Sequence, residues 1–192
     1  MKTTIFHLLI GILCMASVTS CLNSNDAPDS GLSAENIQTA LRSMHGSYSG
    51  EMKWVCGTDS GKVAHVNWKV DSLITIQNFP AAVIAHAIAS GNENVRAMLG
   101  TAAPQELKVY FNFYHLESSQ YIFVTETPTL KFSYTANGVT HNATMEFAKL
   151  NLASVFLPVG RQMGCVVAAN SLMVDNTFIN INPIYFYFQN AQ

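Results

Sequence analysis

Residues 130–147 read LKFSYTANGVTHNATMEF, which is two strand-like runs joined by Asn137-Gly138. This dipeptide is the strongest short-range signal for a β-hairpin, because both central residues of a two-residue type I′ turn need a positive φ. After the turn, alternate residues fall on one face, as expected for a strand with one buried side. That face would carry Val139, His141, Ala143, Met145 and Phe147. The segment therefore predicts antiparallel β-sheet.

The same period of two recurs outward from this hairpin. In residues 48–56, alternate positions including Tyr48, Met52 and Trp54 share one face, and a turn at 57–61 leads into a partner strand at 64–70. We count about eight to ten strands in all, which predicts a sandwich or barrel built as an antiparallel meander. The other expected strands are 73–76, 107–116, 121–125, 130–134, 164–168, 177–181 and 184–188.

Helix signals appear in two main places, and residues 95–99 add another turn or two. Ser33 is a typical N-cap residue, and an apolar stripe follows it until the chain reaches Gly46, which predicts a short N-terminal helix. An Ala-rich helix is expected near 80–90, where Pro80 precedes Ala81 and the pattern stops at Gly91. The fold class is therefore mainly β (α+β).

Charge is sparse and scattered. The chain has 10 Lys and Arg against 12 Asp and Glu, for a formal net charge of −2. No basic surface of the kind that binds phosphate backbones is expected, so nucleic acid is excluded as a partner. The length after a short leader fits a single domain, which we place at residues 32–192.

The first twenty residues have the form of an export signal. Lys2 precedes an apolar run at residues 5–15, and small residues follow up to Ser20. A permanent transmembrane helix is the first alternative, and the run is too short for one. Val18-Thr19-Ser20-Cys21 resembles a bacterial lipobox, which implies that Cys21 is acylated; an ordinary secretory signal beside a cysteine is the second alternative. Residues 21–31 would then be the lipidated cysteine and a flexible tether.

Short motifs in the folded part carry two resemblances. The lipobox, Gly46-Ser47-Tyr48-Ser49-Gly50 and Asn78-Phe79-Pro80 resemble uncharacterised lipoproteins of Bacteroidetes, a family described only as a domain of unknown function. The helix before a Gly-and-aromatic strand is similar to the calycin barrels, the lipocalins among them. Here the chain departs from the lipocalin pattern, since Tyr48 follows Gly46 and the tryptophan comes only at Trp54. The resemblances imply an envelope protein, lipid-anchored at the outer membrane, with a calycin-like barrel.

Reactive chemistry is poorly represented. Two cysteines of the mature chain, Cys56 and Cys165, would be in an oxidising compartment, and whether they form a disulfide or remain separate buried thiols is left open. The mature histidines are dispersed without metal-ligand spacing, so no metal site is expected. The Gly46–Gly50 motif mimics a serine-hydrolase elbow but precedes a strand, where the elbow needs a strand followed by a helix. We expect no catalytic residues, no cofactor and no enzyme activity.

Aromatic residues are unusually dense in the expected strands at 107–116 and 121–125, and they supply most of the candidate binding residues. Either both faces of these strands are covered, or the rings line an apolar cavity or an exposed platform. The leading prediction is a non-catalytic module that binds a small apolar ligand. The alternatives are a surface module with a filled core that contacts glycan or another envelope protein, and, least favoured, a hydrolase. The ligand-facing candidates are Trp54, Trp68, Tyr110, Phe111, Phe113 and Tyr114.

Overall fold

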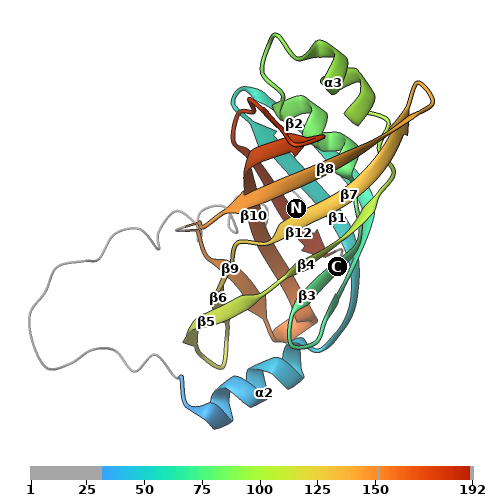
Figure 1. Ribbon diagram of the computed structural model, residues 1–192. Helices are drawn as coiled ribbons and strands as arrows, with labels where there is room; N and C mark the ends of the chain where they lie inside the picture. Colours follow the sequence, from blue (N-terminus) through green and yellow to red (C-terminus); the bar gives the residue numbers. More distant parts are fainter. Residues whose placement is uncertain (1–31, 151, 191–192) are drawn as a thin grey trace, which may run out of the picture.

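The structure, a computed structural model, describes residues 32–150 and 152–190. These residues form one antiparallel sheet of twelve strands with short helices at its ends (Figure 1). The predicted mainly β class is confirmed. The strands are β1 Gly46–Cys56, β2 Asp59–Val70, β3 Ile74–Phe79, β4 Gln105–Val109, β5 Phe111–Leu116, β6 Tyr121–Thr125, β7 Thr129–Ala136, β8 Val139–Ala148, β9 Ser154–Leu157, β10 Gln162–Val174, β11 Thr177–Ile179 and β12 Ile184–Asn190.

The sheet curls back on itself. Its main ladder runs β4-β3-β2-β1-β12-β10-β9-β6-β5, and the two end strands, β4 and β5, are consecutive in the chain with only Tyr110 between them. The two ends of the ladder are therefore joined by the chain, and the sheet curls into the barrel-like shape in Figure 1. This curled antiparallel sheet agrees with the predicted calycin-like barrel or sandwich, although β4 and β5 do not pair with each other to close it.

The Asn137-Gly138 hairpin forms as predicted. Both residues have positive φ, 52° and 77°, and β7 pairs with β8 from Thr129↔Glu146 to Ala136↔Val139. The long strand β10 connects this hairpin to the barrel, pairing with β9 near its start and with β8 near its end. The hairpin thus covers the side of the barrel where β9 and β6 do not reach (Figure 1).

In the part of the chain that the structure describes, four helical segments lie at the two ends of the barrel (Figure 1). The α-helix α2 spans Ala34–Met44 at one end, where the Ser33 hydroxyl accepts a hydrogen bond from the Asn36 amide at 3.1 Å, as its capping role predicts. The 3-10 helix η1, Ala81–Ala87, and the α-helix α3, Glu93–Leu99, lie at the opposite end. A second 3-10 segment, η2 (Val159–Arg161), joins β9 to β10 at the α2 end.

The interior is filled by large side chains. Trp68, Phe79, Phe186 and Phe188 have at most 2% of their surface exposed and belong to a single continuous core cluster. Their rings pack edge to face, with centroids 5.0 Å apart for Phe79 and Phe186 and 6.2 Å apart for Trp68 and Phe188. A cavity that admitted a ligand would leave accessible area on the side chains lining it, so these values describe a packed core.

Several predictions about elements need correction. The described residues form twelve strands where about eight to ten were expected, because the expected strand at 107–116 is broken at Tyr110 into β4 and β5 and because β9 was not predicted. The strand expected at 73–76 extends to Phe79. The first turn is the Gly57-Thr58 pair and not residues 57–61. The Ala-rich segment is 3-10 helix ending at Ala87, because Ile88 forms a bridge to Ile181 and Ala89 donates to Asn180. The strand expected at 177–181 ends at Ile179, because Asn180 and Ile181 contact this segment after η1.

Candidate functional site

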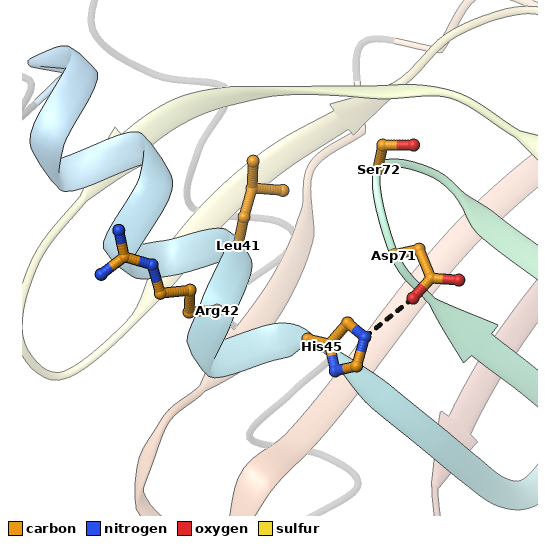
Figure 2. Close-up of a pocket in the computed structure, with 5 residues that line it drawn as sticks. All are labelled: Leu41, Arg42, His45, Asp71 and Ser72. Atoms are coloured by element: carbon orange, nitrogen blue, oxygen red, sulfur yellow. Dashed lines mark ion pairs between the residues drawn. The ribbon is translucent and has the colours of Figure 1, made fainter.

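A groove opens at the α2 end of the barrel, between α2 and the β2–β3 turn (Figure 2). Its volume is about 410 Å³, and it is open to solvent on one side. Leu41 and Arg42 come from the last turn of α2, His45 follows that helix, and Asp71 and Ser72 come from the turn. The groove is of ligand size but open to solvent, whereas the pockets that hold small apolar ligands enclose most of the ligand's surface.

Asp71 is the electrostatic centre of this groove. Its two carboxylate oxygens lie 2.7 Å from Lys69 Nζ and 2.9 Å from His45 Nε2. The hydrogen bond from Lys69, followed by the charges of Lys69 and His45, lowers the pKa of Asp71. Because the folded-state pKa is lowered, the pairing stabilises the fold above the carboxyl's unfolded pKa and is lost as the pH falls through the lowered value. Both partners are well exposed, so this contribution is small.

The groove also contains a serine, a histidine and an aspartate, but not in the arrangement of a catalytic triad. His45 faces Asp71, whereas the hydroxyl of Ser72 points away from His45 (Figure 2). A nucleophile needs its base within hydrogen-bonding reach. These three side chains are therefore not arranged as a Ser-His-Asp triad.

The six ligand-facing candidates fall into two groups. Trp54 and Trp68 lie in the packed interior, and Phe111 and Phe113 pack against that core from β5. The indole Nε1 of Trp68 reaches only Met163 Sδ at 3.4 Å, and the ring of Trp54 lies 4.2 Å from that of His86. All four side chains therefore contribute to the packing of the core, and their prediction as ligand-facing residues stays a prediction.

Tyr110 and Tyr114 are different, because they are 57% and 68% exposed. They alternate with the inward-packed Phe111 and Phe113 and therefore lie, with Asn112, on the outer face of the barrel. We call Tyr110, Asn112 and Tyr114 the tyrosine strip. The side-chain amide of Asn112 donates to Glu126 Oε1 at 2.7 Å, and the backbone N–H of Glu126 donates to the Tyr110 carbonyl oxygen at 2.8 Å.

The polar members of this surface were missed in the sequence. Asn112 stands among five aromatic or apolar neighbours, and Glu126 lies beyond the next strand, so neither belongs to a recognisable motif. The alternation of residues 110–114 was the available signal, since period two separates the two tyrosines from the two phenylalanines.

Cys56 and Cys165 do not form a disulfide; both are free and buried. Cys165 on β10 pairs with Phe188 on β12, and Phe188 pairs with Met52 on β1, four residues before Cys56. One strand thus separates the two cysteines, which places them at least two strand spacings, about 10 Å, apart. A disulfide needs Cα atoms closer than about 7 Å. The bridge left open by the sequence is therefore ruled out by the strand order.

We expect both thiols to be inert until the protein unfolds. Burial raises the pKa of Cys165 to about 12, and burial together with the charge of Asp59 raises that of Cys56. Since the thiolate is the reactive form, a chain lacking residues 1–21 should not react with a thiol reagent at pH 8. Unfolding it without reductant should release two reactive thiols. An intact mass two hydrogens lower, with no thiol released, would contradict the strand order.

Among residues 32–150 and 152–190, histidines pair with carboxylates at four separate places. The shortest contacts are His115–Glu117 at 2.6 Å and His141–Asp175 at 2.7 Å. Hydrogen bonds from the Asn142 amide and then from His141 lower the pKa of Asp175. Among the residues that the structure describes, no three His, Cys, Asp or Glu side chains gather closely enough to hold a metal ion.

Comparison with known protein families identifies the family of this chain. Residues 43–174 match the model of a family described as a domain of unknown function, DUF4840. This chain belongs to the DUF4840 family. No curated protein and no solved structure gives a significant match.

The DUF4840 match covers more than half of the chain, and the expected resemblance to a domain of unknown function is confirmed at this level. It includes the β2–β3 turn and the tyrosine strip but ends before β11 and β12. Strand β12 lies between β1 and β10, so the barrel needs a segment outside the matched region. Within residues 32–150 and 152–190, no helix is long and apolar enough to cross a membrane.

Proposed function

We propose that this protein is a lipid-anchored, non-catalytic binding module of the bacterial cell envelope, which binds a glycan through the tyrosine strip. The observation that carries the proposal is the combination of a filled interior with two exposed tyrosines on one strand. A binding module with a packed core has to contact its partner from the outside. Exposed aromatic side chains grouped on one surface commonly mark such contacts.

The filled interior weighs against the small apolar ligand. Pockets for such ligands bury most of the ligand's surface inside a cavity of several hundred Å³. Here the corresponding space in the barrel is taken by Trp68, Phe79, Phe186 and Phe188, which are almost fully buried. Opening a ligand site among them would mean displacing aromatic side chains from a close-packed core. The surface alternative is therefore better supported by the geometry.

The chemistry of the tyrosine strip suits a sugar chain. Tyr110 and Tyr114 offer ring faces against which the C–H faces of pyranose rings can pack, and their hydroxyls remain available for hydrogen bonds. Asn112 and Glu126 lie beside them and share one hydrogen bond of 2.7 Å. An amide and a carboxylate together have more donors and acceptors than one bond uses, so sugar hydroxyls can be bound from both.

The anchor belongs to the same proposal. The export signal at residues 1–20, Cys21 and the tether up to residue 31 lie outside the described residues, and they are proposed from the sequence pattern alone. We propose acylation at Cys21 and location at the outer membrane. Replacing Cys21 with serine should abolish the lipid mass on the mature N-terminus and release the protein from membranes; persistence of that mass would refute the assignment.

Glycan binding is tested with the full chain in mild detergent and a panel of immobilised neutral polysaccharides. We expect the double variant Tyr110→Ala/Tyr114→Ala to lose at least about tenfold in affinity, which corresponds to about 1.4 kcal/mol. The matched control is Phe178→Ala, because Phe178 on β11 is also an exposed aromatic residue, at 78%.

Two results would refute this function. The first is a double variant that binds a polysaccharide as tightly as the wild-type protein binds it. The second is a discrete apolar molecule that co-purifies with the protein and is lost on organic extraction, since that would require a cavity in the barrel. Capture of an envelope protein through the same two tyrosines, with no polysaccharide bound, would replace the glycan with a protein partner.

A further inference from the structure

We infer that the α2 end of the barrel faces the bilayer, and that η2 and the β2–β3 turn contact its surface while the η1–α3 end points away. This inference rests on the proposed lipid anchor at Cys21. Figure 1 shows α2, η2 and the β2–β3 turn at one end of the barrel and η1 and α3 at the other. The interaction surface is therefore defined by one end of the fold, and the partner is a phospholipid surface.

The length of chain before the domain selects this end. Eleven peptide steps separate Cys21 from Leu32, the first described residue. A polar chain of that length has a root-mean-square span of about 20 Å and a maximum of about 40 Å. The length of the barrel is comparable to this maximum span, because β10 has 13 residues and a strand rises about 3.3 Å per residue. Only the α2 end of the barrel can therefore touch the bilayer that holds the Cys21 lipid without the tether being almost fully extended.

The surface at this end has the composition for a bilayer contact. Val159 is 84% exposed at the apex of η2, and Leu32 is also exposed just before α2. Arg42 and Lys69 lie at the same end and can approach phosphate groups, although Asp71 neutralises part of that charge. The surface is too small and too weakly charged to hold the protein by itself. The lipid supplies attachment, and the surface sets the orientation.

The turn that presents Val159 is firmly held. Arg161, two residues later, donates from Nη2 to the His45 carbonyl oxygen at 2.8 Å and to the Tyr48 hydroxyl at 3.0 Å. Its guanidinium also lies 5.5 Å from the centroid of the Tyr48 ring. The exposed valine is therefore fixed relative to α2 and the start of β1. A fixed apolar side chain at the anchored end gives the barrel one preferred face toward the bilayer.

The experiment compares two exposed valines at opposite ends. Val159→Cys places a single reactive thiol on η2, and Val139→Cys places one beside the β7–β8 turn, where the residue is 56% exposed and far from α2 (Figure 1). The native Cys56 and Cys165 are buried and will not take the label. Each full-length variant, exported and processed by its own host, is labelled with a fluorophore. It is then reconstituted into vesicles of phosphatidylethanolamine and phosphatidylglycerol that carry nitroxide-labelled headgroups.

We expect the label at position 159 to be quenched at least twofold more than the label at 139, with the difference abolished in detergent. Ser72→Cys, on the exposed β2–β3 turn, is a second reporter for the same end and guards against local disruption of η2. Equal quenching at all three positions, or stronger quenching at 139, in protein that floats with the vesicles would overturn the orientation alone. Protein that lacks the lipid mass and does not float would overturn the anchor and this inference together.

Discussion

Replacing Trp68 with alanine is expected to lower the free energy of unfolding by about 3–5 kcal/mol, the range for aromatic-to-alanine changes in a core. Only 1% of the Trp68 side chain is exposed. Its indole stacks on Tyr48 at a centroid distance of 6.0 Å and meets Phe188 edge to face. Alanine would leave a cavity among side chains that strands β1, β2 and β12 hold in place. Equilibrium unfolding in urea, followed by circular dichroism, measures the change.

The matched control for Trp68→Ala is Tyr114→Ala, because Tyr114 is a large aromatic residue that is mostly exposed. A surface substitution of this kind should change the unfolding free energy by no more than about 0.5 kcal/mol. If Trp68→Ala cost as little as the control, the interior would be loosely packed. The case against an internal ligand cavity would then fail, because it depends on the same side chains.

Gly50→Ala should destabilise the protein by about 3 kcal/mol, the upper part of the range for overpacking. A Cβ on Gly50 would lie 2.0 Å from the carbonyl oxygen of Gln189 and 2.5 Å from the Cα of Asn190, and both are backbone atoms. Strand β12 cannot withdraw without cost, since the Asn190 side chain accepts from the Met163 amide at 2.6 Å and donates to the Arg161 carbonyl oxygen at 3.0 Å. The shift needed to admit a methyl group would disturb the junction of β1, β12 and β10.

Gly57→Asn is the matched glycine control. Gly57 has a φ of +59°, and nothing lies within 4 Å of the position its Cβ would take. Asparagine adopts this left-handed conformation more readily than most residues, so the cost should stay below about 1 kcal/mol. Chemical denaturation of both variants under the same conditions gives the comparison. Equal stability of Gly50→Ala and the wild type would mean that β1 and β12 are not in the close contact described here.

Local patterns predicted most of the elements correctly, because their signals depend on near neighbours in the chain. The Asn137-Gly138 turn, the Ser33 cap and the alternation in β1 and β2 each follow from conformational preferences over a few residues. The predictions that failed depended on distant partners. The break at Tyr110 occurs because β4 pairs with β3 while β5 pairs with β6, and no residue within 105–116 signals that change of partner.

The same division applies to the candidate site. The sequence identified the dense aromatic region, but it grouped Tyr110 and Tyr114 with Phe111 and Phe113 as ligand-facing, and only the structure separates the two pairs. It did not indicate which tryptophans would be buried, because burial is decided by what packs on a strand. Nor did it show that β12 separates Cys56 from Cys165, or that His45 and Asp71 border one groove.

The sequence by itself determined the mainly β class, the hairpin at 137–138 and the first helix, whereas export and lipidation remain proposals from its N-terminal pattern. These follow from side-chain periodicity, φ preferences and capping, which act within about ten residues. Only the tertiary structure decided that the sheet curls until β4 and β5 join its two ends, that large aromatic side chains fill the interior, and that the two thiols stay apart. The physical reason is that these features depend on strand order, which long-range pairing and close packing select among arrangements with the same local pattern.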